Sequence, residues 1–521
     1  MTRPTTTGKA QDLITFTRST TGTALAKISY GEELVTNGTF DDGTTGWTAG
    51  DAESLLSIVS NSLRLTNNDA GTAYVYSSYF TTVVGKDYTI SFNVSGTSDT
   101  AKRARLLVIG QSEGTLYDSS NVYSVQKVVQ TFTANDTSTR LILSNGNLTG
   151  VGAYFDFDNV TVKEVLYDQP DGTIQLFNHP INKPRIEYDA SGNCLGLLVE
   201  EARTNQATHS EDLTVSAWGL MPNSFRNSTN SIAPDGTAGA TRFYTNSNVP
   251  AFLQQICPGS VGAKTHIVSC WARSTNGGAD QTFRLKNTHA AVTDFYSDNK
   301  TATSEWQRFI FTTTFISASN TAVIAGIVED SSANQFDIEV WGMQVEFDTS
   351  FPTSYIPTSG SAVTRAADIA SLAVSEFGYN QDQGTFVAQA TSFYLGTNRE
   401  TVISTVDSSS NLGVFVGKTA GGGDIDALYA GEGGSNTYFS LGAITEDTSY
   451  KFAFAIKTDD FAGSKDGDAV VTDTSGTQRT SITDLGIGSR KNASNRLNGH
   501  IKSIQYYPLR LSNAQLQALT V

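Results

Sequence analysis

Aromatic side chains that could bind a sugar are concentrated in one short stretch of this chain. In AYVYSSYF, residues 73–80, Tyr74 and Tyr76 are two positions apart and would point to the same side of a strand. Tyr117 and Tyr123 follow on a later loop. Flat aromatic rings pack against the apolar face of a pyranose, while amides and carboxylates bond its hydroxyls. We therefore predict a glycan-binding site at these four tyrosines, with packing in the core or in a subunit contact as the alternative.

A glycine-rich stretch, residues 419–439, is the second candidate site. It combines carboxylates with aromatic rings, at Asp424, Asp426, Tyr429 and Tyr438. It lacks the Gly-Lys-Ser/Thr ending of a phosphate-binding loop. Because rim loops of β-sandwiches often carry function, we predict glycan binding here too, with a loop that binds nothing as the alternative.

The sequence contains no pattern that would support catalysis. Its five histidines are scattered, and none falls in a nucleophile-elbow or zinc-ligand pattern. Glycoside hydrolysis needs two carboxyl groups about 5 to 10 Å apart. The adjacent Glu200 and Glu201 are better explained as partners in structural salt bridges, to Arg185 or Arg203. We predict that the protein is not an enzyme.

Size and composition limit the class of protein. The 521 residues are too many for one hydrophobic core and predict about three or four domains. The 46 Gly, 27 Phe and 20 Tyr, with abundant Thr, Ser and Val, are typical of short strands joined by polar turns. The net charge of −16 would repel a nucleic-acid backbone, so no nucleic acid is expected as a partner.

The cysteines and the apolar segments indicate the compartment. Cys194, Cys257 and Cys270 form no CxxC pair, which predicts reduced, mostly buried thiols. The first residues lack the apolar core of a secretion signal, and no apolar run approaches the roughly 20 residues of a membrane span. We expect a protein that is made in the cytoplasm, does not insert into a membrane, and reaches any outer surface by another route, such as assembly into a particle.

Two stretches of the chain follow the same plan. In residues 33–166, period-2 segments such as YTISFNVSG alternate with polar turns, as in a two-sheet antiparallel sandwich. In residues 206–350, Trp218 takes the place of Trp47 and HIVSCWARS that of YTISFNVSG, in the same order. This repetition predicts two copies of one sandwich. Trp47 is predicted to be a core residue because its counterpart recurs.

A third set of alternating strands follows residue 368. It ends in a short helix for which Ser512 is a suitable N-cap, with Leu516 and Leu519 on one face. Before it, Pro352 and Pro357 interrupt strand pairing and predict a tether.

The clearest resemblance is carried by GLLVEEARTNQATHSEDL, residues 196–213, then Trp218, then FPTSYIPTSGSAVTRAAD, residues 351–368. These phrases resemble the tailed-phage head-spike and tail-fibre family, in which they bracket a β-rich module.

In that family a TFTR-ST phrase runs on within a short distance to a phrase like DGTIQLFNHPINKPRIEYD. Here the two phrases are separated, so residues 33–166 look inserted. We therefore expect residues 14–31 to fold back beside residues 171–205.

Two modules carry resemblances of their own. The opening N-G-T-F and G-W of the insert, with its closing F-D-N-V-T-V, resemble the jelly-roll carbohydrate-binding modules. Those modules often hold a structural calcium, which implies a site at Asn37, Asp41 and Asp158, with turn-forming side chains as the alternative. The ending LNGHIKSIQYYPLRLSNAQLQAL resembles a laminin-G or concanavalin-like sandwich.

The predicted architecture is all-β, with three tandem antiparallel, jelly-roll-like β-sandwich modules joined by short linkers. In chain order we predict an N-terminal attachment segment (1–32), a carbohydrate-binding-like sandwich (33–166), a junction segment (167–205), a second sandwich of the spike or fibre type (206–350), a linker (351–367) and a laminin-G or concanavalin-like sandwich (368–521).

The family resemblance implies a function. Its members are virion proteins, usually homotrimers, that contact other virion proteins and bind host-surface polysaccharide. We expect the same of this chain, as a head spike or tail fibre without catalysis. The alternatives are a purely structural decoration or connector, and a capsule polysaccharide depolymerase.

Overall fold

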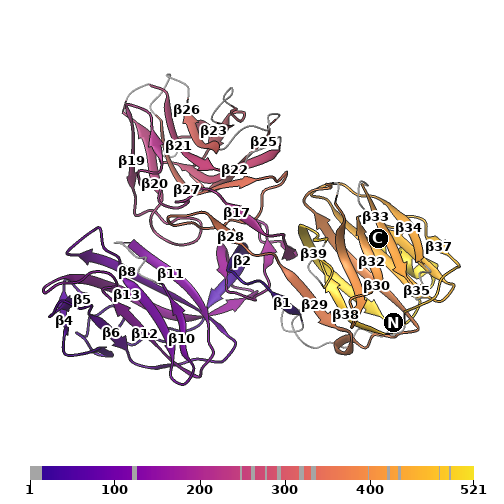
Figure 1. Ribbon diagram of the computed structural model, residues 1–521, viewed down its shortest axis with the longest axis horizontal. Helices are drawn as coiled ribbons and strands as arrows, with labels where there is room; N and C mark the ends of the chain where they lie inside the picture. The colour runs from indigo at the N-terminus through magenta and orange to yellow at the C-terminus, as the bar shows by residue number, and fades with distance from the viewer. Residues whose placement is uncertain are drawn as a thin grey trace.

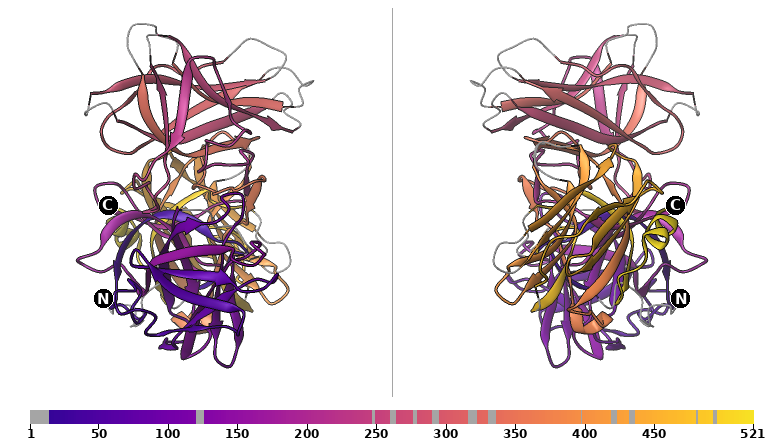
Figure 2. Two further views of the ribbon diagram at one scale, coloured as in Figure 1. Left: turned by 90° about the vertical axis from the view of Figure 1, so that its left-hand side faces the viewer. Right: turned by 90° about the vertical axis from the view of Figure 1, so that its right-hand side faces the viewer.

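The computed structural model describes residues 14–119, 126–246, 249–259, 264–275, 279–289, 295–315, 322–329, 336–396, 398–418, 423–431, 436–479, 481–491 and 495–521. In these residues the chain forms three β-sandwich lobes around a central junction (Figure 1). Side views show the second lobe set apart at one end of the molecule (Figure 2). Within these ranges helix is limited to a 3-10 turn, Val374–Phe377, and to α2, Asn513–Thr520. The predicted all-β class is confirmed.

The first sandwich packs two antiparallel sheets face to face around one core. In one sheet the order is β10 (Gly114–Asp118), β9 (Arg105–Gly110), β12 (Ser138–Ser144), β6 (Tyr74–Ser77) and β3 (Trp47–Ala49), with β7 (Phe80–Thr81) also pairing β12. In the other it is β11 (Gln126–Thr133), β8 (Asp87–Thr97), β13 (Tyr154–Tyr167), β5 (Ser62–Asn67) and β4 (Ser54–Val59).

The second sandwich repeats these strand orders position by position. One sheet has the order β24 (Lys300–Ala302), β23 (Gln281–His289), β26 (Ala322–Glu329), β21 (Ala251–Pro258) and β18 (Gly219–Leu220). The other has β25 (Gln307–Thr314), β22 (Thr265–Ser274), β27 (Asp337–Phe347), β20 (Thr241–Thr245) and β19 (Ser224–Ser228). The predicted internal repeat is confirmed at the level of topology.

Trp47 and Trp218 occupy the same place in the two copies. Trp47 is 5% exposed and donates its indole N–H to the carbonyl of Asn37 at 3.2 Å. Trp218 is 1% exposed and donates to the carbonyl of His209 at 2.9 Å. In both copies the indole fills the core. Its hydrogen bond also attaches the segment that leads into the sandwich, at Asn37 or at His209, to that core. Trp47 is a core residue, as predicted.

The third sandwich takes strands from distant parts of the chain. One sheet runs β1 (Thr15–Thr17), β29 (Ile369–Ala373), β38 (Ile482–Ile487), β31 (Glu400–Asp407), β32 (Leu412–Lys418), β33 (Asp424–Ala430), β34 (Asn436–Ala443). The other runs β15 (Ile186–Tyr188), β16 (Cys194–Val199), β39 (Gly499–Tyr507), β30 (Gln383–Ser392), β35 (Ser449–Lys457), β36 (Phe461–Lys465), β37 (Val471–Asp473). The N-terminal and junction segments therefore supply three strands of this lobe.

The C-terminal helix α2 covers part of this lobe. The Ser512 side chain accepts from the backbone of Gln515, whose side chain returns to the backbone of Ser512, so the N-cap is a capping box. Leu516 is fully buried and Leu519 is packed beside it. The helix start and its apolar face are as predicted.

The three cysteines are free thiols. Burial raises the pKa of Cys257 and of Cys270 to about 12, so both stay protonated and unreactive at neutral pH. Cys194 lies half-buried at the start of β16.

Two short ribbons connect the lobes at the junction. Strand β2 (Gly22–Tyr30) pairs along its length with β14 (Thr173–His179), and its end pairs with the end of β13. Strand β17 (Arg203–Asn205) pairs with β28 (Val363–Arg365). Residues 14–31 thus lie beside residues 171–205, as expected for an inserted first sandwich.

A buried ion cluster holds the junction together. It consists of three arginines and two carboxylates, none more than 1% exposed: Arg18, Arg185, Arg365, Glu200 and Asp368. Arg185 contacts both carboxylates, with Nη2 at 2.9 Å from Glu200 Oε2. Arg18 Nη1 lies 3.2 Å from Asp368 Oδ1, and Arg365 Nη2 lies 3.4 Å from Glu200 Oε2. The salt bridge predicted between Glu200 and Arg185 is confirmed.

Most of the other donors and acceptors of the cluster form hydrogen bonds with backbone or side-chain groups nearby. Arg18 donates to the carbonyls of Thr20, Lys183, His179 and Pro180. The Glu200 carboxylate accepts from both the backbone and the hydroxyl of Ser354, each at 2.7 Å. Buried ions tolerate low dielectric only with such partners.

This cluster predicts sensitivity to acid. Burial alone would raise the pKa of Glu200, but Arg365, Arg185 and the Ser354 hydrogen bonds together lower it from 4.5 to about 2. A carboxylate with a depressed pKa contributes stability above its unfolded-state pKa and loses it as the pH falls through the folded-state value. We expect the urea midpoint to fall between about pH 4.5 and pH 2, and to fall less steeply in Glu200→Gln.

The control for that measurement is Glu164→Gln. Glu164 pairs with Lys86 at 3.1 Å, but the lysine is 56% exposed. Equal slopes in wild type and Glu200→Gln would contradict the assignment.

Candidate functional site

The outer face of the sheet that contains β6 carries the strongest candidate site. Along β6, Val75 and Ser77 point into the core, whereas Tyr74 and Tyr76 point outward and are half-buried. The two rings therefore share one side of the strand, as predicted, and they face away from the other sheet. The alternation of a strand that is buried on one side produces this arrangement.

The rings form a compact aromatic platform with one arginine. Tyr74 and Tyr76 meet edge to face, with centroids 5.5 Å apart and planes at 86°. The Arg140 guanidinium lies 3.9 Å from the Tyr76 centroid and 4.9 Å from that of Tyr79, which is 42% exposed. Gly50 provides the space, since a Cβ there would lie 2.0 Å from the Tyr74 ring.

Polar groups continue the same face beyond the platform. Tyr74 is opposite Ser144 on β12, and Ser144 is opposite Arg105 on β9. Arg105 makes a bidentate pair with Asp118, with Nε 2.8 Å from Oδ1. Burial, then Tyr76 and Asp51, raise the pKa of the Tyr74 hydroxyl, so it stays a hydrogen-bond donor. Rings beside ionic and hydroxyl groups can bind both faces and edges of a sugar.

Sequence reasoning missed several members of this face. Tyr79 lies in the same stretch, residues 73–80, as the predicted tyrosines, and the period-2 alternation of RLLVIG and TRLILS places Arg105 and Arg140 on the outer side. That alternation was a usable signal. The pairing of β12 between β6 and β9 was not visible in the sequence, and it is what brings the arginines to the tyrosines.

The later tyrosines do not join the platform. The Tyr117 ring packs against the hydrophobic core, and on the edge strand β10 it is opposite the core residue Val108. Tyr117 is half-buried and lies apart from Tyr74 and Tyr76, so its assignment to the glycan site stays a prediction. Tyr123 lies outside the described residues.

The second candidate site is only partly at the surface. On β33, the core-facing side is Ile425, Ala427 and Tyr429, and Tyr429 is 1% exposed with its hydroxyl accepting from the backbone of Arg479 at 2.5 Å. Tyr429 is a core residue, so its prediction as a ligand-binding residue is wrong. Asp426 is 2% exposed and does not reach the surface either.

The other two residues of that prediction remain accessible. Asp424 is half-buried and accepts a hydrogen bond from the Ser440 hydroxyl at 3.0 Å. Tyr438 is 53% exposed on β34. Part of the intervening loops lies outside the described residues.

The residues expected to bind calcium lie at one end of the first sandwich. Asn37 uses its side chain to close a turn, with Oδ1 accepting from the backbone of Asp42 at 3.1 Å. Asp158 accepts from the backbone of Asn159, and burial, with a smaller effect of Asp41, raises its pKa. Among the described residues no group of three or more His, Cys, Asp or Glu could hold a metal. Calcium remains a prediction, with Asp41 and Asp158 as the available carboxylates.

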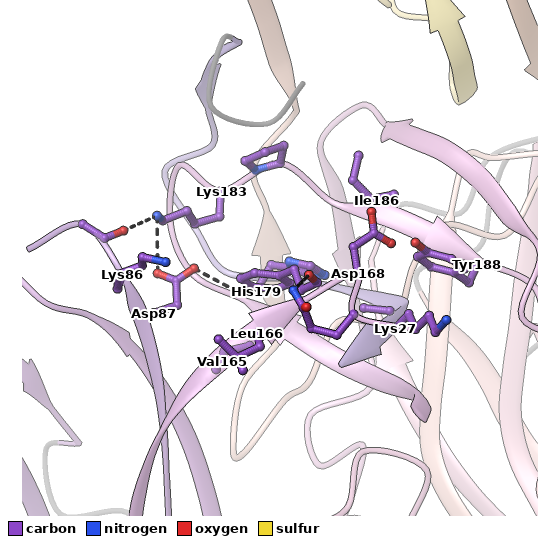
Figure 3. A pocket seen from close by; sticks show the side chains of 15 residues that line it. Lys27, Lys86, Asp87, Val165, Leu166, Asp168, His179, Lys183, Ile186 and Tyr188 are labelled. Atoms are coloured by element: carbon purple, nitrogen blue, oxygen red, sulfur yellow. Dashed lines mark hydrogen bonds and ion pairs between the residues drawn. The ribbon is translucent and has the colours of Figure 1, made fainter. Parts of the chain in front are cut away.

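A small pocket lies where the first sandwich meets the junction (Figure 3). Its volume is about 190 Å³, and Asp87 at its edge accepts from the Tyr167 hydroxyl and contacts Lys183 at 3.5 Å. His179 stacks on Tyr167 with centroids 5.6 Å apart, and burial, Arg18 and Arg185 hold its pKa well below the usual range. The imidazole is therefore neutral. This volume is below the roughly 300 Å³ of an ordinary ligand site.

These sheets define the class of protein: two copies of one jelly-roll-like sandwich joined to a third, larger antiparallel sandwich. No helix of the described residues is both long and apolar enough to cross a membrane. No family model and no curated protein sequence matches the chain.

Several solved structures are similar to parts of it. The CBM22-1–CBM22-2 tandem domain of Paenibacillus barcinonensis Xyn10C covers 62% of this chain and 99% of its own, at 13% identity and TM-score 0.23. The CBM40 of Ruminococcus gnavus IT-sialidase, bound to α2,3-sialyllactose, covers 27% and 84%, at 16% identity and TM-score 0.25. The enzymatically active domain of tailspike protein 4 of bacteriophage CBA120 covers 27% and 21%, at 12% identity and TM-score 0.22. Scores this low carry no functional argument, and the class stands on the sheets themselves.

Proposed function

We propose that this chain is a phage virion protein, a head spike or tail fibre, that binds host-surface glycan through the outer face of its first sandwich and does not cleave it. The proposed virion role is supported by the sequence phrases on either side of the second sandwich, which resemble the head-spike and tail-fibre family. A homotrimer would add avidity, so weak binding at each site would be sufficient.

One observation carries the proposal: the platform of Tyr74, Tyr76 and Tyr79 around Arg140 on an outward sheet face. Aromatic rings that only pack a core are buried. These rings are half-exposed or exposed, and they lie beside Ser144 and the Arg105–Asp118 pair. Stacking aromatics with nearby polar groups are what a surface sugar site requires.

The test is Tyr76→Ala in the full chain, measured on a glycan array and on host cells. Removing the ring deletes the stacking surface, so we expect the affinity for the recognised glycan to fall about ten-fold, which is on the order of 1.4 kcal/mol. The matched control is Tyr154→Ala. Tyr154 also lies under an arginine, Arg64, at 3.7 Å, but on the opposite sheet of the same sandwich. Equal losses in both variants would refute this face as the site.

Absence of catalysis is tested separately. Purified protein spotted on a host lawn is expected to bind without a clearing halo, and oligosaccharide products should not appear. A clearing halo would contradict the proposed adhesin and would favour a polysaccharide depolymerase instead.

A further inference from the structure

A second, larger cleft lies between the second and third sandwiches. Its volume is about 890 Å³, within the roughly 300–1,000 Å³ range of ligand sites. Phe351 comes from the segment after β27, Tyr394 from the loop after β30, and their rings stack with centroids 6.1 Å apart and planes at 24°. Arg203 of β17 lies over Phe351 at 5.8 Å. The cleft therefore has an aromatic wall.

The cleft is positive although the protein is strongly acidic. Two of its four cations are neutralised, since Arg203 pairs with Glu201 and Lys264 pairs with Asp348. Arg399 and Arg496, which also line the cleft, have no carboxylate within 4.0 Å among the described residues, although Arg496 donates its Nε to the carbonyl of Asp368 at 3.4 Å and lies within reach of the charge of Glu201. Against a net charge of −16 for the whole chain, two guanidinium groups without a close carboxylate partner in one cleft are a distinctive feature.

A buried carboxyl group with a spare oxygen also lines this cleft. Glu400, the first residue of β31, is 6% exposed, and its Oε2 has no hydrogen-bond partner among the described residues. Burial, partly offset by Lys418 and Ser392 and reinforced by Glu446 and Glu201, raises its pKa to about 8. Burial therefore favours the protonated form of this group, which can donate a hydrogen bond to a hydroxyl or carboxylate.

We propose that this cleft binds a carboxylated oligosaccharide, with Arg399 and Arg496 holding the acidic groups and Tyr394 facing a sugar ring. Guanidinium groups bind carboxylates in paired, charge-assisted hydrogen bonds. The amides of Asn398 and Asn495, also on the lining, are suited to the hydroxyls. The site is distinct from the platform on the first sandwich and takes a different, acidic ligand.

The experiment is calorimetric titration of the full chain at pH 7. The probes are tetragalacturonate, α2,8-linked tetrasialic acid and a hyaluronan tetrasaccharide, compared with neutral cellotetraose. At least one acidic probe should bind at least ten-fold more tightly than cellotetraose, and added salt should weaken it. If none does, or if inorganic phosphate competes as well as the sugar, the proposal is overturned.

Variants assign the binding to this cleft. Arg399→Gln should weaken the acidic probe at least ten-fold, whereas Lys457→Gln, which removes one exposed charge elsewhere on this lobe, should not. Tyr76→Ala should also have no effect, which separates this proposal from the one for the first sandwich. Unchanged binding in Arg399→Gln would overturn the site.

The pH dependence gives an independent readout. Because the pKa of Glu400 is raised, this group ionises only as the pH rises above its usual range; it would then repel an acidic ligand, so affinity should fall with rising pH in the wild type. The groups that face it are Lys418, Glu446, Glu201 and Tyr450. In Glu400→Gln the affinity should stay nearly constant as the pH rises. A parallel fall in wild type and variant would contradict the role of Glu400.

Discussion

Asp368→Ala is expected to destabilise the protein by about 3–5 kcal/mol, because it removes a carboxylate that is buried among three arginines. Asp368 contacts Arg18 at 3.2 Å and Arg185, and accepts from the backbone of Glu200 at 2.9 Å. Without it, Glu200 alone faces three buried positive charges. The loss should appear as a lower urea midpoint and as new proteolytic cleavage at the junction, with the first and second sandwiches still folded; the third sandwich should be loosened too, because β1, β15 and β16 belong to its sheets.

A matched exposed pair sets the scale for that result. Lys86 and Glu164 are 56% and 28% exposed, and exposed pairs contribute about 0–1 kcal/mol. Glu164→Gln should therefore change the midpoint little. If Asp368→Ala costs no more than Glu164→Gln, the cluster does not hold the lobes.

Trp47→Ala and Trp218→Ala should each destabilise their own sandwich by about 3–5 kcal/mol, the cost of removing a large buried side chain and its cavity. Each indole fills one core and satisfies one backbone carbonyl. Since the copies have separate cores, the effect of either change should stay within its lobe.

The chain provides a convenient probe for this localisation. Of its five tryptophans, only Trp47 lies in the first sandwich; Trp218, Trp271, Trp306 and Trp341 lie in the second. In Trp47→Ala, tryptophan fluorescence therefore reports the second sandwich alone. Its transition should stay at the wild-type denaturant concentration while circular dichroism shows an earlier partial transition. A shift of both signals together would mean that the two copies unfold as one unit.

The strands themselves were predictable because their signal is local. YTISFNVSG forms the centre of β8 and HIVSCWARS that of β22. The repeat of Trp47 at Trp218 reported a shared core position, and the topology of the two lobes bears this out. The Ser512 cap was likewise encoded within a few residues.

Long-range pairing was the part that the sequence did not reveal. The glycine-rich composition of residues 419–439 predicts a rim loop, but Tyr429 lies on β33, on the side that faces the core. The cleft of Arg399, Arg496 and Phe351 is assembled from segments more than forty residues apart, so no local motif marks it. Strands β15 and β16 joined the third sandwich through pairing with β39, which no spacing rule predicts.

The first sandwich begins and ends at neighbouring strands, β2 and β13, so the whole lobe could be exchanged as a unit. The first sandwich is entered after β2 and left through β13, where Gly31 donates to the carbonyl of Glu164 at 2.9 Å. A lobe whose two ends emerge side by side can be exchanged for another of equal end spacing without disturbing the arginines and carboxylates behind it. The outer face that carries the tyrosines could then change by replacement of the whole lobe, while the junction and the other two lobes keep their sequence.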